Sequence, residues 1–211
     1  MHLSKVEYIW LDGSEPTQKL RSKTRILPMG SDDVTLQTFP EWGYDGSSTN
    51  QADGESSDLI LKPVFFTTDP IRGEGNWLVM CEVMNADGTP HATNTRAKLR
   101  ELLEAGAEKH DPWIGFEQEY TFVFRGNRMK SIIPEVHPDE KKGETEISPE
   151  VRESLPENFY AGYGSYHRWG RKIAEEHARR CAQIGILLWG VNAEVGPGQW
   201  EFQTRPNLPI D

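Results

Sequence analysis

Four glutamates stand in two short segments whose composition is typical of β-strands. Glu117 and Glu119 lie in the segment GFEQEYTF, and Glu194 and Glu201 lie on either side of a Gly-Pro-Gly turn in NAEVGPGQWEFQ. Side chains two positions apart on a strand point to the same face, so Glu117 and Glu119 are expected to project together. A lone Glu-x-Glu pair is usually the solvated face of a half-buried strand whose other face is aromatic.

The relation between Glu194 and Glu201 depends on the turn that separates them. A two- or four-residue hairpin loop would set Glu194 directly opposite Glu201 on one face of the sheet. A three-residue loop would put the two side chains on opposite faces unless a bulge restored the register. Four carboxylates in one cavity repel each other strongly unless a cation lies among them. Because all of these ligands are oxygens, the expected ion is Mg²⁺ or Mn²⁺.

The elements around these segments indicate an α+β chain. We expect strands at residues 6–11 and 78–84, with several Asp-Gly turns between them. A helix is expected to follow Thr93 or Asn94, either of which can cap it, and Gly106 marks a weak point or an end.

A second helix is predicted from Tyr166 to Leu188, where apolar residues recur in steps of three and four. His177 lies in this apolar stripe and is expected to be a packed, hydrogen-bonded core residue. The charged stretch 137–157 has no such pattern, so we expect an exposed loop there.

Composition and charge exclude several classes of protein. The formal net charge of −10 leaves no basic surface for a nucleic-acid partner. No apolar run approaches the length that spans a bilayer, and no signal peptide is visible, so we expect a cytoplasmic protein that does not enter membranes. Cys81 and Cys181 lie in separate segments that look like a strand and a helix, and they are expected to be free buried thiols.

Short motifs run through nearly the whole chain. They are YIWLDG at 8–13, RSKTR at 21–25, WGYDGSSTNQA at 42–52, SDLILKP at 57–63, CEV at 81–83, HDPWIGFEQEYT at 110–121, YAGYG at 160–164, NAEV at 192–195 and QWEFQ at 199–203. In this order and spacing they resemble the glutamine synthetase family, in the shorter form common in eukaryotes and some bacteria. The resemblance implies a β-grasp domain at residues 1–93. At 94–211 it implies the first part of a catalytic domain, an antiparallel sheet with helices.

The activity implied by the resemblance is ATP-dependent ligation of ammonia to L-glutamate through γ-glutamyl phosphate. Three glutamates are implied to hold the metal nearest the substrate carboxylate: Glu119, Glu194 and Glu201. Glu117 is implied to hold a second metal that bridges the ATP phosphates. The positions implied to contact ATP are Trp113, Glu201, Phe202, Gln203 and Pro206. Thr204 and Arg205 depart from the small residues that the family usually has there.

Two aspartates are implied to serve the ammonium substrate. Asp45 matches the aspartate that binds ammonium and helps to remove its proton, and Asp58 matches another aspartate of that site. A carboxylate concentrates the cation and favours its deprotonation. Asp45 also begins an Asp-Gly sequence, and it can instead be the start of a turn in which Ser47 and Ser48 bond the backbone.

The resemblance also raises expectations about completeness and assembly. A full-length member would continue for well over a hundred residues beyond Asp211, with further metal, ATP and glutamate contacts. The aspartate loop of one family subunit completes the active site of its neighbour, so a homo-oligomer or a complementary chain is expected. Two alternatives stay open. One is a non-catalytic pseudoenzyme or assembly module that docks onto a full-length synthetase, and the other is a related ligase that uses a different amine.

Overall fold

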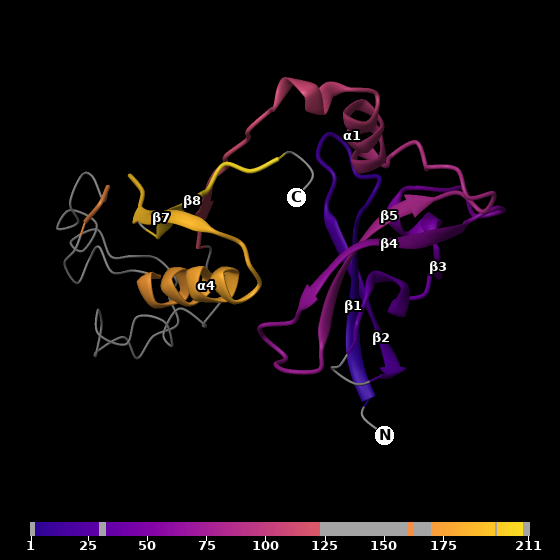
Figure 1. The fold of residues 1–211 in the computed structure, drawn as a ribbon, viewed down its shortest axis with the longest axis horizontal. Helices are drawn as coiled ribbons and strands as arrows, with labels where there is room; N and C mark the ends of the chain where they lie inside the picture. The colour runs from indigo at the N-terminus through magenta and orange to yellow at the C-terminus, as the bar shows by residue number, and fades with distance from the viewer. Residues whose placement is uncertain (1–2, 30–32, 123–159, 163–169, 197, 209–211) are drawn as a thin grey trace, which may run out of the picture. The chain divides into compact units, whose positions relative to one another are not determined.

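The computed structural model of this 211-residue chain describes residues 3–29, 33–122, 160–162, 170–196 and 198–208 (Figure 1). Its contacts group into two compact units, one of residues 1–112 with 208–211 and one of residues 113–207. The predicted domain boundary after residue 93 stays a prediction, and the contacts place the helix that follows it in the first unit. The loop predicted at 137–157 lies outside the described residues.

A five-stranded sheet forms the first unit, in the order β2-β1-β5-β4-β3 (Figure 1). Strands β1 and β5 are parallel, and the other neighbouring strands are antiparallel. The strands are β1 (Leu3–Leu11), β2 (Leu20–Pro28), β3 (Trp42–Asp45), β4 (Asp58–Thr68) and β5 (Trp77–Met84). Short 3₁₀ helices are η1 (Leu36–Thr38), η2 (Gly46–Thr49) and η3 (Ala107–His110). The strands expected at 6–11 and 78–84 are therefore confirmed as parts of β1 and β5.

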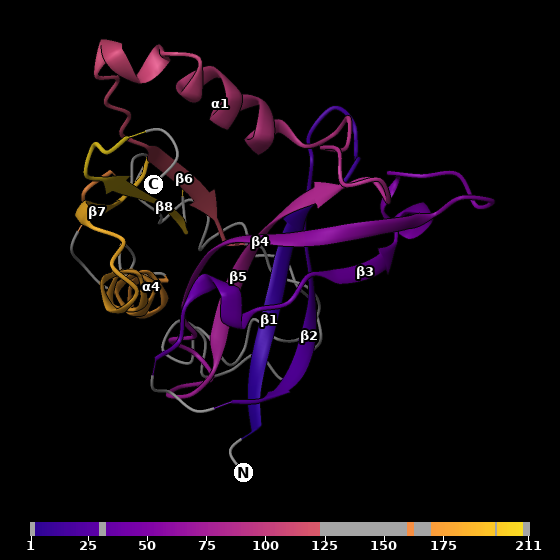
Figure 2. The same cartoon turned by 45° about the vertical axis from the view of Figure 1, so that its right-hand side comes forward.

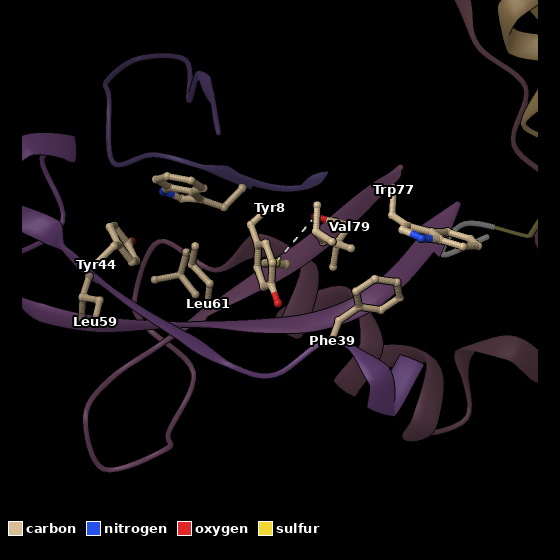
Figure 3. Packing of buried hydrophobic residues seen from close by; sticks show 11 residues of the cluster. Tyr8, Phe39, Tyr44, Leu59, Leu61, Trp77 and Val79 are labelled. Atoms are coloured by element: carbon tan, nitrogen blue, oxygen red, sulfur yellow. Dashed lines mark hydrogen bonds between the residues drawn. The ribbon is translucent and has the colours of Figure 1, made fainter. Parts of the chain in front are cut away.

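One face of this sheet carries the core of the first unit. Alternate residues of β1 and β5 point into it because side chains on a strand alternate between faces. Tyr8 is fully buried in the middle of the cluster (Figure 3), and its hydroxyl donates a hydrogen bond of 2.7 Å to the Pro40 carbonyl. The buried members are Val6, Tyr8, Trp10, Phe39, Tyr44, Leu59, Leu61, Trp77, Val79, Cys81 and Val83.

The first helix, α1 (Thr95–Glu104), begins and ends where the sequence indicates. Asn94 is its N-cap, and the Asn94 side chain accepts a hydrogen bond of 3.0 Å from the N–H of Ala97. Gly106 follows the helix with a φ of 115°, a left-handed conformation that glycine adopts without a Cβ clash. The predicted N-cap is confirmed, and of the two alternatives for Gly106, a weak point or an end, the structure shows the end of the helix.

A buried ion-pair group joins α1 to the sheet. Glu82 lies on β5 with 1% of its surface exposed, and its carboxylate accepts hydrogen bonds of 3.1 Å from both Arg96 and Arg100. Burial favours the neutral acid, but the hydrogen bonds and positive charges of Arg100 and then Arg96 hold the pKa of Glu82 below its ordinary value.

A three-stranded antiparallel sheet and one helix form the described part of the second unit (Figure 2). The strands are β6 (Glu117–Thr121), β7 (Leu188–Ala193) and β8 (Gln199–Thr204), in the order β6-β8-β7, and the helix is α4 (Arg171–Gln183). A small core on one face of the sheet contains Trp200, Ala193 and Ala174, with Tyr120 and Phe122 packed against it. The opposite face of the sheet is polar.

The predicted helix from Tyr166 to Leu188 is partly wrong. The helix ends at Gln183, and Leu188 begins β7. Gly185 follows the helix with a φ of 85°, which turns the chain out of the helix before the strand begins. Residues 163–169 lie outside the described residues, so the predicted start of this helix is not described either.

Smaller predictions for the second helix and the cysteines are confirmed. The ring of His177 is half-buried, packs against Phe202 with centroids 5.0 Å apart and lies within 3.4 Å of the Cys181 Sγ, so it is packed and hydrogen-bonded as predicted, at the margin of the core. Cys81 and Cys181 are free and buried, on β5 and α4. Burial raises the pKa of the Cys81 thiol to about 12, so it is protonated at neutral pH. Within the described residues, no helix is long and apolar enough to cross a membrane.

Candidate functional site

The four glutamates lie on the polar face of the β6-β8-β7 sheet, here called the carboxylate face. Glu119 of β6 stands directly opposite Glu201 of β8, and Glu117 stands opposite Gln203. Directly opposite residues of an antiparallel pair have Cβ atoms about 5 Å apart. The predicted projection of Glu117 and Glu119 to one face is confirmed by this register.

The predicted pairing of Glu194 with Glu201 is wrong in register but right in face. Asn192 is the residue opposite Glu201, and the N–H of Glu194 donates a hydrogen bond of 2.8 Å to the carbonyl of Gln199. A four-residue loop separates Glu194 from Gln199. Since opposite positions in an antiparallel pair have a constant sum, this loop places Asn192, not Glu194, across from Glu201. Glu194 is two positions beyond Asn192, so it shares the face with Glu201 as a diagonal neighbour.

Neutral amides hold the carboxylates in place. The Asn192 Nδ2 donates to Glu194 Oε1 at 2.9 Å and to Glu201 Oε2 at 3.2 Å. The Asn192 Oδ1 accepts a hydrogen bond of 2.8 Å from Gln203. The Gln199 Nε2 donates to Glu119 Oε2 at 2.7 Å. These amides orient the acidic side chains without neutralising their charge.

The negative charge of the carboxylate face has no cationic partner within the described part of the chain. None of the ion pairs found there includes Glu117, Glu119, Glu194 or Glu201. Hydrogen bonds from Gln203 and then Asn192 hold the pKa of Glu201 below its ordinary value, so this group is ionised at neutral pH. Glu194 is only 9% exposed. A carboxylate with that little contact with water needs a compensating charge.

The side chains of the four glutamates share a face, but they are not arranged as a metal coordination sphere. Among the described residues, no three His, Cys, Asp or Glu side chains converge closely enough to hold an ion. The donor chemistry nevertheless fits Mg²⁺ or Mn²⁺, because it consists of carboxylate and amide oxygens. Mg²⁺ usually keeps several waters and takes one or two protein carboxylates together with substrate phosphates. The opposed residues Glu119 and Glu201 provide two such carboxylates, and Glu194 lies beside them.

An open hollow of about 500 Å³ lies at the end of the carboxylate face near Glu117. It contains two of the residues predicted to contact ATP, Gln203 and Pro206. Its lining consists of Gly115, Phe116, Glu117, Trp189, Gln203, Thr204 and Pro206. Gly115 lets its backbone lie close to Thr204 and Pro206, because a Cβ there would lie 3.4 Å from both the Pro206 ring and the Thr204 carbonyl oxygen.

Two other predicted ATP contacts lie elsewhere in the second unit. Trp113 is 60% exposed but does not line the hollow. The ring of Phe202 packs against His177 and Tyr120, on the face opposite the carboxylates. The structure therefore brings Gln203 and Pro206 together with Glu117, and it leaves Trp113 and the side chain of Phe202 outside this group.

The two aspartates predicted for the ammonium site are cross-strand neighbours in the first unit. Asp45 ends β3 and Asp58 begins β4, and the register pairs them directly. Ser47 donates to Asp45 Oδ1 through its hydroxyl at 2.7 Å and its N–H at 2.9 Å, so Asp45 also caps η2. These bonds, then one from the Ser57 side chain, hold the pKa of Asp45 below its ordinary value. Like charges directly opposite each other in a sheet repel, and a cation beside both carboxylates would offset that repulsion.

A buried glutamine fixes the loop that carries Asp45. The Gln51 Oε1 accepts hydrogen bonds from the hydroxyls of Tyr44 at 2.7 Å and Thr49 at 2.8 Å. Its Nε2 donates to the Leu11 carbonyl at 3.1 Å and to the Thr93 hydroxyl at 2.8 Å. Because every polar atom of this amide is satisfied, the loop has a defined position on the sheet.

Comparisons with known proteins show the family of this chain. Residues 2–86 match the family model described as the β-grasp domain of glutamine synthetase. A glutamine synthetase of Streptomyces viridochromogenes is 46% identical over 211 residues, which cover 98% of this chain and 55% of that protein. The chloroplastic glutamine synthetase of Chlamydomonas reinhardtii is 42% identical over 214 residues, covering 97% of this chain and 52% of that protein.

The chain belongs to the glutamine synthetase family. The predicted β-grasp fold of its first part is confirmed. A cryo-EM structure of the Plasmodium falciparum glutamine synthetase has the same fold, with a TM-score of 0.61 at 16% identity, over 97% of this chain and 41% of that one. The chain spans about half the length of the curated glutamine synthetases that it matches.

Three residues of the candidate site were not assigned from sequence. Asn192 and Gln199 each stand two positions before a predicted ligand, Glu194 or Glu201, so the period of two along a strand was the available signal. Trp189 gave no such signal. It has the parity of the core residues Val191 and Ala193, yet it lines the hollow.

Proposed function

We propose that this chain supplies metal ligands and ammonium-binding aspartates for ATP-dependent ligation of ammonia to L-glutamate. The carboxylate face carries the proposal: Glu119 stands opposite Glu201, Glu194 lies diagonally beside them, and neutral amides hold all three. A face with uncompensated negative charge and oxygen ligands is suited to Mg²⁺ or Mn²⁺ and, through the ion, to phosphates.

The proposed chemistry activates the side-chain carboxylate of glutamate, which is a poor electrophile. A carboxylate does not release oxide, so the γ-phosphoryl group of ATP is first transferred to the side chain of glutamate, which gives γ-glutamyl phosphate. Bound Mg²⁺ or Mn²⁺ would supply positive charge to offset the phosphate oxygens. Glu119, Glu194 and Glu201 would hold one ion, and Glu117 would hold a second. Asn192 and Gln199 orient these ligands.

Ammonia then attacks the acyl carbon and phosphate leaves. Asp45 and Asp58 bind the ammonium ion and favour the loss of its proton, because ammonium is not a nucleophile until it is deprotonated. The low pKa of Asp45 keeps its carboxylate charged for this role. In the proposal, the active enzyme is a homo-oligomer or includes a complementary chain, because in the family that this chain resembles the aspartate loop of one subunit completes the active site of its neighbour.

Metal binding tests the carboxylate face directly. Titration of Mn²⁺ followed by electron paramagnetic resonance is expected to show binding that Glu201→Gln and Glu194→Ala weaken at least tenfold. Glu175→Gln is the matched control, because Glu175 is an exposed glutamate on α4 of the same unit. Equal binding by all four proteins would remove the metal assignment.

Ligase activity tests the reaction. Formation of γ-glutamyl hydroxamate from glutamate, hydroxylamine, ATP and Mg²⁺ is expected to be lost in Glu201→Gln and retained in Glu175→Gln. Binding of Mn²⁺ without hydroxamate, both for the chain alone and after mixing with a full-length synthetase whose own site is inactivated, would favour the non-catalytic alternative.

A further inference from the structure

Trp189 is out of phase with its own strand. Regular alternation along β7 would place it with Val191 and Ala193, which pack on the core face. The pairing with β8 instead shifts between Leu188 and Gly190, so Trp189 is the extra residue of a β-bulge. Bulges re-aim side chains, and they are frequent beside functional sites. The indole is 70% exposed and lines the hollow.

The hollow combines flat apolar walls with one polar edge. Phe116, Trp189 and Pro206 provide the apolar walls, and Glu117 and Gln203 belong to the carboxylate face. Its volume of about 500 Å³ is in the range of pockets that take small ligands. A large indole left in water is unfavourable unless a ligand covers it.

We propose that Trp189 is a stacking platform for the purine base of the nucleotide. The inference rests on the proposed function, in which Glu117 would hold an ion and ATP is the phosphoryl donor. A ligand that meets Glu117 through such an ion and covers Trp189 must have an anionic end and a flat end, which describes a nucleoside triphosphate. Stacking on the indole uses the π-face of the base and needs no further hydrogen bond.

The test separates the base from the phosphates. Isothermal titration calorimetry of the 211-residue chain with Mg²⁺–ATP and Mg²⁺–tripolyphosphate measures both affinities, and tripolyphosphate has no base. Trp189→Ala is expected to weaken ATP binding roughly 5- to 150-fold, the range for loss of one base–aromatic stack, and to leave tripolyphosphate binding unchanged. Trp189→Phe is expected to retain most of the ATP affinity. Phe65→Ala is the matched control, an aromatic residue that is 55% exposed in the first unit.

The outcomes distinguish the two proposals. Equal ATP affinity in the wild type and Trp189→Ala, with tripolyphosphate still bound, would overturn the stacking role and leave the metal–phosphate site standing. A similar loss of both ligands in Trp189→Ala, with an unchanged circular dichroism spectrum, would overturn it too, since it would mean that Trp189 acts on the phosphate end. No binding of either ligand by the wild type would overturn the nucleotide part of the proposed function together with this inference.

Discussion

The buried acids of the first unit and the glutamates of the second are held by different kinds of partner. Each buried acid among the described residues of the first unit forms an ion pair with an arginine of the same unit. The pairs are Asp12 with Arg21 at 2.8 Å, Asp69 with Arg72 at 3.0 Å, and Glu82 with Arg96 and Arg100 at 3.1 Å each. On the carboxylate face, the partners among the described residues are the side-chain amides of Asn192, Gln199 and Gln203 and the backbone N–H of Val195.

This difference separates a structural carboxylate from a binding one. An arginine both orients and neutralises its carboxylate, so the pair has no charge left for a ligand. An amide orients the carboxylate and leaves the charge in place, so the group stays ready for a cation at the expense of repulsion among its neighbours. The comparison teaches that the partners of an acid, more than its burial, indicate its role. Glu82 and Glu194 are both buried, yet only Glu82 is compensated.

The largest expected effect comes from removing the arginines of the first unit. The double variant Arg96→Ala/Arg100→Ala leaves Glu82 buried and uncompensated, and it should destabilise the first unit by about 3 to 5 kcal/mol. Hydrogen exchange of the β5 amides measures this locally, without a contribution from the second unit. Glu101→Ala, an exposed change on the same helix, is the control. Exchange rates in the double variant equal to those of the control would break the comparison.

The pH dependence of the first unit's stability is expected to be an effect of intermediate size. Its sign should reverse in the double variant Arg96→Ala/Arg100→Ala. In the wild type the pKa of Glu82 is below 4.5, so its contribution is present above that pH and is lost as the pH falls through the folded-state pKa. Without the arginines, burial alone raises the pKa, and stability should increase as the pH falls from 7 toward 4.5. Each unit of pKa shift corresponds to about 1.4 kcal/mol. Exchange of the β5 amides at several pH values measures the slope, and parallel slopes for the two proteins would contradict the prediction.

The smallest stability effect is expected on the carboxylate face. Asn192→Ala removes two hydrogen bonds to glutamates and leaves space in which water can bind them, so without metal the second unit should lose about 1 kcal/mol or less. The same change should weaken Mn²⁺ binding several-fold, because Glu194 and Glu201 lose their common orienting partner. Hydrogen exchange of β8 and the Mn²⁺ titration measure the two quantities. A large loss of stability with normal Mn²⁺ affinity would make these carboxylates structural, like Glu82.

Local features of the fold were predictable where the signal was short-range. Asn94 was one of two expected caps, and it binds the N–H of Ala97, because a side chain of this type satisfies a free donor at any helix start. The prediction that the second helix reaches Leu188 was wrong because a long-range contact decided this segment. Apolar residues after Gln183 continue the helical period by chance. Leu188 instead pairs with Thr204 of β8 and so belongs to the sheet.

The candidate site was predictable in composition and only partly in geometry. A period of two fixed Glu117 and Glu119 on one face, but the partner across the sheet from Glu201 depended on the loop length, which put Asn192 there. Which predicted ATP contacts come together also required the structure, since Gln203 and Pro206 line the hollow with Glu117 and the ring of Phe202 packs on the other face.

By itself, the sequence determined the family, the acidic ligand types and their spacing along each strand, because these depend on residue identity and on the backbone period. Only the tertiary structure decided which carboxylates face each other, which amides hold them, and that a bulge turns Trp189 out of the core and into a hollow. The physical reason is that register and bulges are set by hydrogen bonds between strands far apart in the chain. Glu119 and Glu201 meet through such a ladder.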